Sequence, residues 1–179
     1  MRIISGSRRG HRLFEFKGRD IRPTTDRVKE AIFSMIAGYI PDAEVLDMFA
    51  GSGALSFEMI SRGAAHAVLI DKDKRSVEVI KRNIEALGFE SGCEVVNTSC
   101  FDWLKMNARR FDVIFLDPPY NKGFIEESLE AIVKAGALSD DGIIVLESDN
   151  TDFRSDFPGL VMWKQKRYGR TYITVYQKE

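Results

Sequence analysis

The chain reads Asp47-Met48-Phe49-Ala50-Gly51-Ser52-Gly53 where a short apolar run, Val45-Leu46, meets a helix expected over about residues 54–62. Gly51 and Gly53 let the backbone turn sharply and bring its N–H groups close to a ligand at the start of that helix. The segment therefore predicts a strand, a ligand-binding loop and a helix, in that order.

Strands and helices alternate on the carboxyl side of this loop. We expect strands at residues 67–70, 94–96, 113–116 and 143–146, and helices at about residues 74–87, 101–106 and 125–135. This alternation is typical of a parallel sheet with helices on both faces. Two further β-rich runs, residues 160–166 and 171–177, have no helix between them and should pair antiparallel at or near the sheet edge. The predicted fold class is α/β, with a mostly parallel seven-stranded sheet and an antiparallel C-terminal edge.

The amino-terminal part has a different pattern. Residues 2–5 and 11–16 are expected to form two short strands of a small β-hairpin around a turn-rich segment. After Pro23, Thr24 or Thr25 can cap a helix that continues to about Gly38. We therefore predict a basic β-hairpin appendage at residues 1–20 and one α/β domain at residues 21–179.

The composition is that of one compact globular domain. The 179 residues include 44% apolar and 30% charged residues, and the formal net charge is −1. No run approaches the roughly 18–20 apolar residues that cross a bilayer, and the first residues lack the apolar region of a signal peptide, so we expect a cytoplasmic protein without a membrane partner. Two cysteines and two histidines make a four-ligand zinc site implausible, and we predict no metal. Cys93 and Cys100 are expected to be reduced packing residues.

The charge is distributed unevenly along the chain. Residues 1–22 contain seven Lys or Arg against two acidic residues, and residues 164–179 contain five against one. The body between them is correspondingly acidic. Basic ends on an acidic body suggest a polyanionic partner held by the termini. The alternative is that these charges only keep the surface hydrated.

An acidic residue follows the second expected strand. Asp71 lies 20 residues after Gly51, where a carboxylate can accept both hydroxyl groups of a ribose. This spacing is shared by folds that bind NAD and folds that bind S-adenosylmethionine. Asp47 favours the second ligand, because a carboxylate before the loop would repel a pyrophosphate but can assist binding of the cationic amino group of a methionine moiety. A purely structural alternative is that Asp47 caps backbone groups in the turn.

The strand at residues 113–116 ends in Asp117-Pro118-Pro119-Tyr120, at the sheet edge where ligands bind in open α/β folds. The prolines fix φ and remove two N–H donors, so the turn presents carbonyl oxygens beside a carboxylate and an aromatic ring. If Asp117 and the carbonyl of Pro118 accept the hydrogens of an exocyclic purine amine, its nitrogen can be directed at a methyl group on a sulfonium while Tyr120 stacks on the base. The base must then be unstacked or extruded. The alternative is a turn that only ends the strand.

The tetrapeptide resembles the D/N-P-P-Y/F motif of amino-methyltransferases, which act on adenine N6, cytosine N4, guanine N2 and glutamine side chains. Four segments together closely resemble the RsmD family, bacterial methyltransferases of guanine N2 in 16S rRNA. They are residues 3–13 (IISGSRRGHRL), 22–30 (RPTTDRVKE), 47–55 (DMFAGSGAL) and 117–120 (DPPY). The resemblance spans nearly the whole chain, and residues 22–28 are its most specific element.

The resemblance implies a Rossmann-like enzyme that uses S-adenosylmethionine to methylate the guanine at position 966 of 16S rRNA, in the small ribosomal subunit or its assembly intermediate. By position, the residues that face the guanine would be Asp117, Pro118, Pro119 and Tyr120. The residues that line the cofactor would be Asp47, Phe49, Ala50, Gly51, Gly53, Thr25, Cys100 and Phe101, with Asp71 on the ribose. One departure concerns the adenine: the superfamily often has an acid after the third core strand, and Ser99 stands there. The backbone at Cys100 or Phe101, or the side chain of Asp102, would then contact the adenine.

Five arginines are expected to bind RNA, namely Arg8, Arg9, Arg12, Arg22 and Arg27. The segment that contains Arg22 and Arg27 has two interpretations. In the functional one, Thr24 and Thr25 lie near the cofactor and the arginines contact phosphate. In the structural one, Thr25 and Asp26 cap a helix and Arg27 pairs with an acid.

Three other functions fit part of the pattern. A DNA or RNA adenine-N6 or cytosine-N4 methyltransferase could use the same tetrapeptide, but such enzymes generally carry a separate target-recognition region for which 179 residues leave little room. A non-catalytic RNA-binding protein would have no use for Asp47, Asp71 and Asp117 together. An NAD-dependent oxidoreductase is disfavoured by Asp47 and by the paired prolines.

Overall fold

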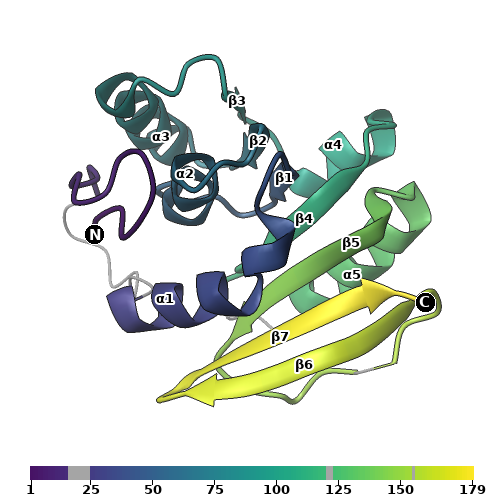
Figure 1. Ribbon diagram of the computed structural model, residues 1–179. Helices are drawn as coiled ribbons and strands as arrows, with labels where there is room; N and C mark the ends of the chain where they lie inside the picture. Colours follow the sequence, from purple (N-terminus) through teal and green to yellow (C-terminus); the bar gives the residue numbers. More distant parts are fainter. Residues whose placement is uncertain (16–24, 120–122, 155) are drawn as a thin grey trace.

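The computed structural model describes residues 1–15, 25–119, 123–154 and 156–179, and its centre is a seven-stranded sheet (Figure 1). The strands are β1 (Glu44–Asp47), β2 (His66–Ile70), β3 (Cys93–Val96), β4 (Phe111–Leu116), β5 (Leu138–Ser148), β6 (Leu160–Tyr168) and β7 (Thr171–Lys178), in the spatial order β3-β2-β1-β4-β5-β7-β6. Strands β1 to β5 are parallel, whereas β7 is antiparallel to both β5 and β6. The predicted α/β class and the antiparallel C-terminal edge are confirmed.

Helices cover both faces of the sheet (Figure 1). They are α1 (Asp26–Met35), α2 (Ala54–Ser61), α3 (Lys74–Leu87), α4 (Cys100–Met106) and α5 (Phe124–Ala135), with a short 3₁₀ helix at Ala37–Tyr39. Successive strand residues enter different cores: Val45 of β1 packs in a cluster with α1, α2 and α3, and Leu46 packs in a cluster with α4 and α5. Burial on both faces explains the continuous apolar runs of the central strands. None of the helices in the described ranges is long and apolar enough to cross a membrane.

Two elements differ in extent from the sequence-based prediction. Helix α1 ends at Met35, and the 3₁₀ turn takes up the residues that were expected to continue it. Strand β5 begins at Leu138, five residues before the predicted start, and pairs there with Phe111. Its first part was missed because the run Ser139-Asp140-Asp141-Gly142 is polar and turn-like, and both aspartates are solvent-exposed.

The amino-terminal segment, residues 1–15, forms a short antiparallel pairing that packs on α2, as the predicted hairpin requires, although the pairing is shorter than the two predicted strands. An antiparallel bridge between Arg2 and Arg12 joins its two limbs, and the backbone N–H groups of Ile3 and Leu13 donate across it to the carbonyls of His11 at 2.9 Å and Met1 at 3.0 Å. The backbone N–H groups of Ile4 and Ser5 donate to the carboxylate of Glu58 at 2.9 Å each. Because these donors are satisfied by a side chain of α2, they are not available for a strand ladder. The remainder of the predicted appendage, residues 16–20, lies outside the described residues.

A buried ion cluster holds this segment on the sheet domain. The ammonium group of Lys29 lies 2.9 Å from Glu58 Oε2, both side chains are fully buried, and Lys29 Nζ also donates to the carbonyl of Arg2 at 2.9 Å. Arg62 adds a second cation at 2.8 Å from Glu58 Oε1. Burial raises the pKa of Glu58, but the bonds from Ile4, Lys29 and Arg62 outweigh it and hold the pKa below its usual value. Burial lowers the pKa of Lys29, and its bond to Glu58 opposes that shift. The segment and the first two helices are therefore joined through the Glu58 carboxylate.

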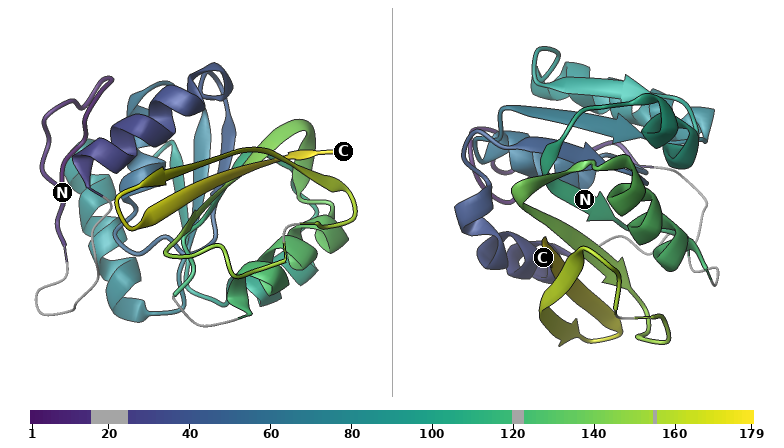
Figure 2. Two further views of the ribbon diagram at one scale, coloured as in Figure 1. Left: turned by 90° about the horizontal axis from the view of Figure 1, so that it is seen from below. Right: turned by 90° about the vertical axis from the view of Figure 1, so that its right-hand side faces the viewer.

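The reversed direction of β7 brings the β6–β7 hairpin tip to the edge of the sheet where the parallel strands end. Tyr172, near the start of β7, pairs with Ser148, the last residue of β5. The right-hand view of Figure 2 shows this hairpin as one end of the sheet. The loops after the parallel strands and the hairpin tip thus share one edge of the sheet, called here the carboxyl edge.

Candidate cofactor and catalytic site

Four acidic residues meet at the carboxyl edge because each ends or follows a parallel strand. Asp47 ends β1, Asp71 follows β2, Asp117 follows β4 and Glu147 lies near the end of β5. The register places Asp47 between Leu69 of β2 and Phe115 of β4, so loops that are far apart in sequence lie side by side. Ligands of open α/β sheets bind at such an edge.

The loop after β1 has the conformation that its glycines predict. Gly51 and Gly53 have φ angles of +56° and +80°, in the left-handed region that side chains disfavour. A Cβ atom on Gly53 would also lie 2.5 Å from the ring of Phe57. The N–H of Ala50 donates to the carbonyl of Ile70 at 3.0 Å. The loop is therefore tied to the end of β2 and packed tightly on α2.

Asp71 fixes this loop while keeping acceptor capacity. Its Oδ2 accepts the backbone N–H of Gly51 at 2.9 Å, and its Oδ1 accepts that of Asp73 at 2.8 Å. A carboxylate offers about four lone-pair sites, so about two remain for a ligand such as a ribose diol. Asp71 is partly exposed, as a ligand contact requires. The bond to the loop was not predicted from the sequence, and the ribose contact stays a prediction.

Asp47 is almost completely buried, with 3% of its surface exposed. Burial raises its pKa to about 7, although hydrogen bonds from the Ser56 hydroxyl and the Phe49 backbone N–H act in the opposite direction and the charge of Asp71 adds to the rise. The Ser56 bond is 2.9 Å long. The bonds show that Asp47 has a structural role in the turn. They leave its predicted contact with a cationic amino group untested.

Asp117 is the acidic residue of the tetrapeptide and is partly buried. Burial raises its pKa well above the usual value, and the charges of Glu147 and Asp47 raise it further. Pro118 is buried and Pro119 is exposed, whereas Tyr120 lies outside the described residues. Acidic groups that repel one another at one edge suit a ligand that brings positive charge. Sequence reasoning missed Glu147, whose only signal is an acid at the end of an apolar strand.

An aromatic cluster lies beside the acids. The rings of Phe101 and Phe124 stack with centroids 6.2 Å apart, and Phe49 meets Phe124 edge-on at 6.4 Å. Phe49 and Phe101 were predicted as cofactor contacts, and the structure brings them together through Phe124, which was not predicted. An adenine ring can be held by such a cluster. The signal for Phe124 is its aromatic side chain a few residues after the tetrapeptide.

The other candidates for the adenine site differ in accessibility. Cys100 is buried, and burial raises the pKa of its thiol to about 12, so it stays protonated. Asp102 is exposed and forms an ion pair with Lys105 at 3.2 Å, turned toward solvent rather than into the cluster. Backbone groups at the start of α4 therefore fit the adenine edge better than the Asp102 side chain. No group of three or more possible metal ligands occurs among the described residues.

The residues predicted to bind RNA fall into three groups. Arg9, Arg12 and Arg27 are exposed, and within the described residues their side chains make no hydrogen bond or ion pair. Arg8 instead docks on the domain, since its Nε donates to the carbonyl of Leu87 at 2.5 Å and its guanidinium lies 5.7 Å from the Phe89 ring centroid. Arg22 lies outside the described residues.

Thr25 is the one threonine of its pair that the structure describes, since Thr24 lies outside the described residues. Its hydroxyl accepts the backbone N–H of Val28 at 3.4 Å and caps α1, as the structural interpretation predicted. The pairing of Arg27 with an acid, which the same interpretation predicted, does not occur among the described residues. Asp26 pairs instead with Arg2, at 2.9 Å.

Comparisons with known proteins agree with this geometry. The family described as Conserved hypothetical protein 95 matches residues 1–177. YlbH of Bacillus subtilis, provisionally named an rRNA methyltransferase, is 38% identical, and the alignment covers 99% of both chains. Ribosomal RNA small subunit methyltransferase D of Escherichia coli is 35% identical over 100% of this chain and 90% of its own length. The solved structure of yhhF from Escherichia coli, provisionally described as a methyltransferase, has a TM-score of 0.91 and 36% identity, covering 100% of this chain and 98% of that chain.

Proposed function

Because the chain belongs to the family described as Conserved hypothetical protein 95, the RsmD family, we propose that it transfers a methyl group from S-adenosylmethionine to the N2 amine of a guanine in small-subunit ribosomal RNA. The observation that carries this proposal is the full-length similarity to a ribosomal RNA small subunit methyltransferase D, at 35% identity, together with the acids at the carboxyl edge. An rRNA substrate implies that the enzyme acts in the cytoplasm.

The described residues fit S-adenosylmethionine. Asp71 retains acceptor sites for a ribose, and the Phe49, Phe101 and Phe124 cluster offers aromatic surface for an adenine. Asp47 is a buried carboxylate that a cationic amino group would neutralise. A nearby cation lowers the pKa of a carboxyl group, so binding would favour the ionised forms of Asp47 and Asp117. The cofactor, when bound, supplies the electrophilic methyl group on its sulfonium.

The role of Asp117 follows from the poor nucleophilicity of an exocyclic amine. Asp117 and the carbonyl of Pro118 would accept its two hydrogens, so that the nitrogen lone pair is no longer held in the plane of the ring. Most of the rate enhancement would then come from position and electrostatics, with the proton passing late to Asp117 or to water. Tyr120 is proposed to stack on the guanine, as in the motif it matches. The guanine must be unstacked to enter this site.

Two finer points belong to the same proposal. The target is proposed to be the guanine at position 966, in the small subunit or in an assembly intermediate. The alternative target class, adenine N6 or cytosine N4, is not favoured, because the relatives that match the whole chain are named for rRNA.

The test is transfer of labelled methyl groups in parallel to small subunits, naked rRNA and duplex DNA, with small subunits taken from a strain that lacks this chain. The modified nucleoside is then identified by mass spectrometry. We expect N2-methylguanosine in rRNA and no label in DNA. Methylated adenine or cytosine, or label in DNA alone, would overturn the proposal. The comparison of free rRNA with assembled particles identifies the form of the substrate.

A further inference from the structure

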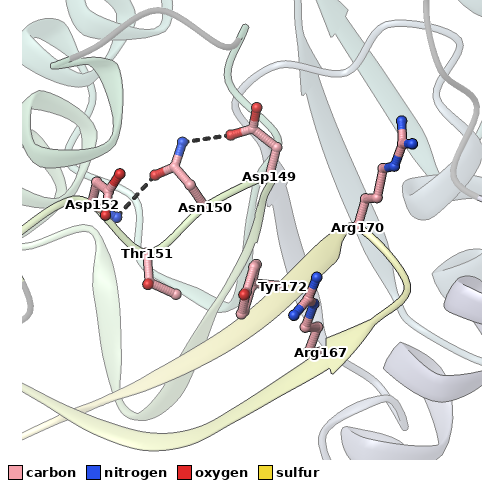
Figure 3. Close-up of a pocket in the computed structure, with 7 residues that line it drawn as sticks. All are labelled: Asp149, Asn150, Thr151, Asp152, Arg167, Arg170 and Tyr172. Atoms are coloured by element: carbon pink, nitrogen blue, oxygen red, sulfur yellow. Dashed lines mark hydrogen bonds between the residues drawn. The ribbon is translucent and has the colours of Figure 1, made fainter.

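A pocket of about 480 Å³ lies between the loop that follows β5 and the tip of the β6–β7 hairpin (Figure 3). Its polar lining includes Asp149, Asn150, Asp152, Arg167, Arg170 and Tyr172. Neither the proposed cofactor contacts nor the proposed contacts with the target base involve any of these residues. The pocket therefore needs an explanation of its own.

The pocket adjoins the proposed catalytic site. Leu116, which precedes Asp117, pairs with Leu146 on β5, so Asp117 follows β4 at the level of Glu147. Asp149 comes two residues later on the same chain, and Tyr172 pairs with Ser148 from the opposite side of β5. Two strand spacings, about 10 Å, separate β4 from β7. A nucleotide next to a base at Asp117 would lie within reach of this pocket.

The loop wall of the pocket is a preorganised set of hydrogen-bond acceptors. Ser148 Oγ donates to the carbonyl of Asn150 at 2.8 Å, Asn150 Nδ2 donates to Asp149 Oδ1 at 2.7 Å, and Asn150 Oδ1 accepts the N–H of Asp152 at 2.9 Å. These bonds, two of which are drawn in Figure 3, hold the loop in one conformation. The carboxylates of Asp149 and Asp152 retain free lone pairs for N–H donors of a ligand.

The hairpin wall carries the opposite charge and an aromatic ring. The guanidinium of Arg167 lies 5.4 Å from the ring centroid of Tyr172, and its Nε donates to the carbonyl of Gly169 at 2.9 Å. Arg170 is exposed and makes no hydrogen bond or ion pair with any residue in the described ranges. No ion pair joins the two walls within those ranges either. The acidic groups of the loop wall and the basic groups of the hairpin wall thus line the same cavity without pairing with each other.

We propose that this pocket binds the nucleotide adjacent to the target guanine in a single-stranded stretch of RNA, which rests on the proposed function. Arg167 and Arg170 contact its phosphate, Tyr172 stacks on its base, and the loop acids accept N–H groups from the base edge. A free inorganic anion fits less well, because two carboxylates face it. A nucleotide offers an anion at one end and N–H donors at the other, as the two walls require.

The first experiment removes the two cations. Arg167→Gln/Arg170→Gln is compared with Arg110→Gln/Lys134→Gln, a matched removal of two exposed charges at the opposite edge of the sheet. Methyl transfer to small subunits gives kcat and KM at several salt concentrations, and calorimetry gives the affinity for S-adenosylmethionine. We expect the KM for RNA to rise about tenfold in the hairpin variant, and the magnitude of its salt slope to fall by about 0.7 for each phosphate that is no longer neutralised.

The control variant should keep a KM close to that of the wild type, and both variants should keep their cofactor affinity and kcat. Equal effects in the two double variants would overturn the proposal, because net charge alone would then explain the change. A wild-type enzyme that does not methylate rRNA at all would instead contradict the proposed function. The two failures are therefore distinguishable.

The second experiment tests the base contact. Tyr172→Leu removes the aromatic ring, whereas Tyr172→Phe keeps it and serves as the control. Loss of one stacked base should raise the KM for RNA about fivefold to a hundredfold in the leucine variant only. If the leucine variant keeps the wild-type KM and the arginine variant does not, the pocket binds phosphate alone and the nucleotide assignment is wrong.

Discussion

Asp47 is a buried carboxyl group whose ionisation lowers the stability of the folded protein. Its pKa in the folded chain is about 7, above the ordinary value of 3.8. A carboxyl group with a raised pKa contributes stability that is fully present below the unfolded value. That contribution is lost as the pH rises through the folded pKa, between about pH 4 and 7. Above pH 7 the ligand-free protein therefore holds a buried negative charge at Asp47, which lowers its free energy of unfolding.

We predict that Asp47→Asn stabilises the ligand-free protein at pH 8, by about 1–4 kcal/mol, because a neutral amide is cheaper to bury than a carboxylate. Urea unfolding at pH 8 and at pH 4 measures the effect, which should largely vanish at the lower pH. The same variant should bind S-adenosylmethionine at least tenfold more weakly by calorimetry. A variant that is destabilised at pH 8 would show that the Ser56 and Phe49 bonds outweigh the charge.

Asp117→Asn tests the proposed contact with the target amine. We expect turnover to fall about 10²–10⁴-fold, the usual effect of a positioned acceptor, while the cofactor affinity stays close to that of the wild type. Single-turnover methylation of small subunits and calorimetry measure the two quantities. Asp141→Asn, at an exposed position of β5, is the control for the change from acid to amide. Near-normal turnover in Asp117→Asn would exclude a catalytic role.

Single residues of the site could be predicted where spacing alone reports position. The interval between Gly51 and Asp71 indicates two neighbouring parallel strands, and the structure joins these residues by a hydrogen bond. Glu147 and Phe124 could not be found in this way, because their roles depend on which strands become neighbours and on how α5 packs. Pairing partners of buried charges, such as Lys29 and Glu58, are likewise set by tertiary structure.

Among the elements, the amino-terminal segment depends most on one close contact. Gly6 has a φ of +82°, and a Cβ atom there would lie 1.7 Å from the carbonyl oxygen of Ser61, at the end of α2. The N–H of Ser7 donates to that same oxygen at 2.7 Å. The segment can reach the Glu58 carboxylate only because this approach is possible.

We predict that Gly6→Ala displaces the segment and destabilises the protein by about 2–4 kcal/mol, since Glu58 then loses backbone donors while staying near the core. Gly10→Ala is the matched control, because Gly10 has a φ of +87° but no other atom lies within 4 Å of the place where a Cβ atom would sit. It should cost only about 1–2 kcal/mol of backbone strain. Chemical denaturation measures both variants, and hydrogen exchange at Ile4 and Ser5 reports displacement. Equal costs would mean that the close approach to α2 is not limiting.

The strands and helices of the sheet domain were predictable, because the apolar runs, the glycines and the helical periodicity indicate the same elements along most of the chain. The antiparallel pairing of the amino-terminal limbs was predictable in the same way, but its short extent was not, because the sequence does not show which acceptors the N–H groups of Ile4 and Ser5 bind. The N–H groups of Ile4 and Ser5 donate to the Glu58 carboxylate of α2, whereas that of Ile3 donates to the partner limb at His11. The early part of β5 was missed for a related reason, since its polar residues take their conformation from the neighbouring β4.

For the whole molecule, the unequal distribution of charge suggests how RNA is held. The acidic body should repel RNA, so the basic amino-terminal part is proposed to supply affinity. Arg8 is partly committed to the bond with Leu87, whereas Arg9 and Arg12 are exposed. Replacing Arg9 and Arg12 therefore tests RNA binding without breaking a side-chain hydrogen bond or ion pair among the described residues.

We predict that Arg9→Ala/Arg12→Ala weakens rRNA binding and lowers the magnitude of its salt slope by about 0.7–0.9 for each arginine that neutralises a phosphate in the wild type. The affinity for S-adenosylmethionine should not change, because neither arginine is among the proposed cofactor contacts. Filter binding at several salt concentrations gives the slope, with Arg110→Ala/Lys134→Ala as a control of equal charge. An unchanged slope would mean that these arginines only hydrate a turn.

The direction of β7 has a consequence for how such enzymes could diversify. Because β7 runs antiparallel to β5, the turn between β6 and β7 lies at the carboxyl edge, and no helix has to cross the sheet to bring it there. The hairpin tip can therefore change in length and sequence while the acids keep their positions. Exchanging the tip between two homologous chains should retarget methylation to a different RNA context and leave the chemistry intact, which makes the hairpin a transferable module.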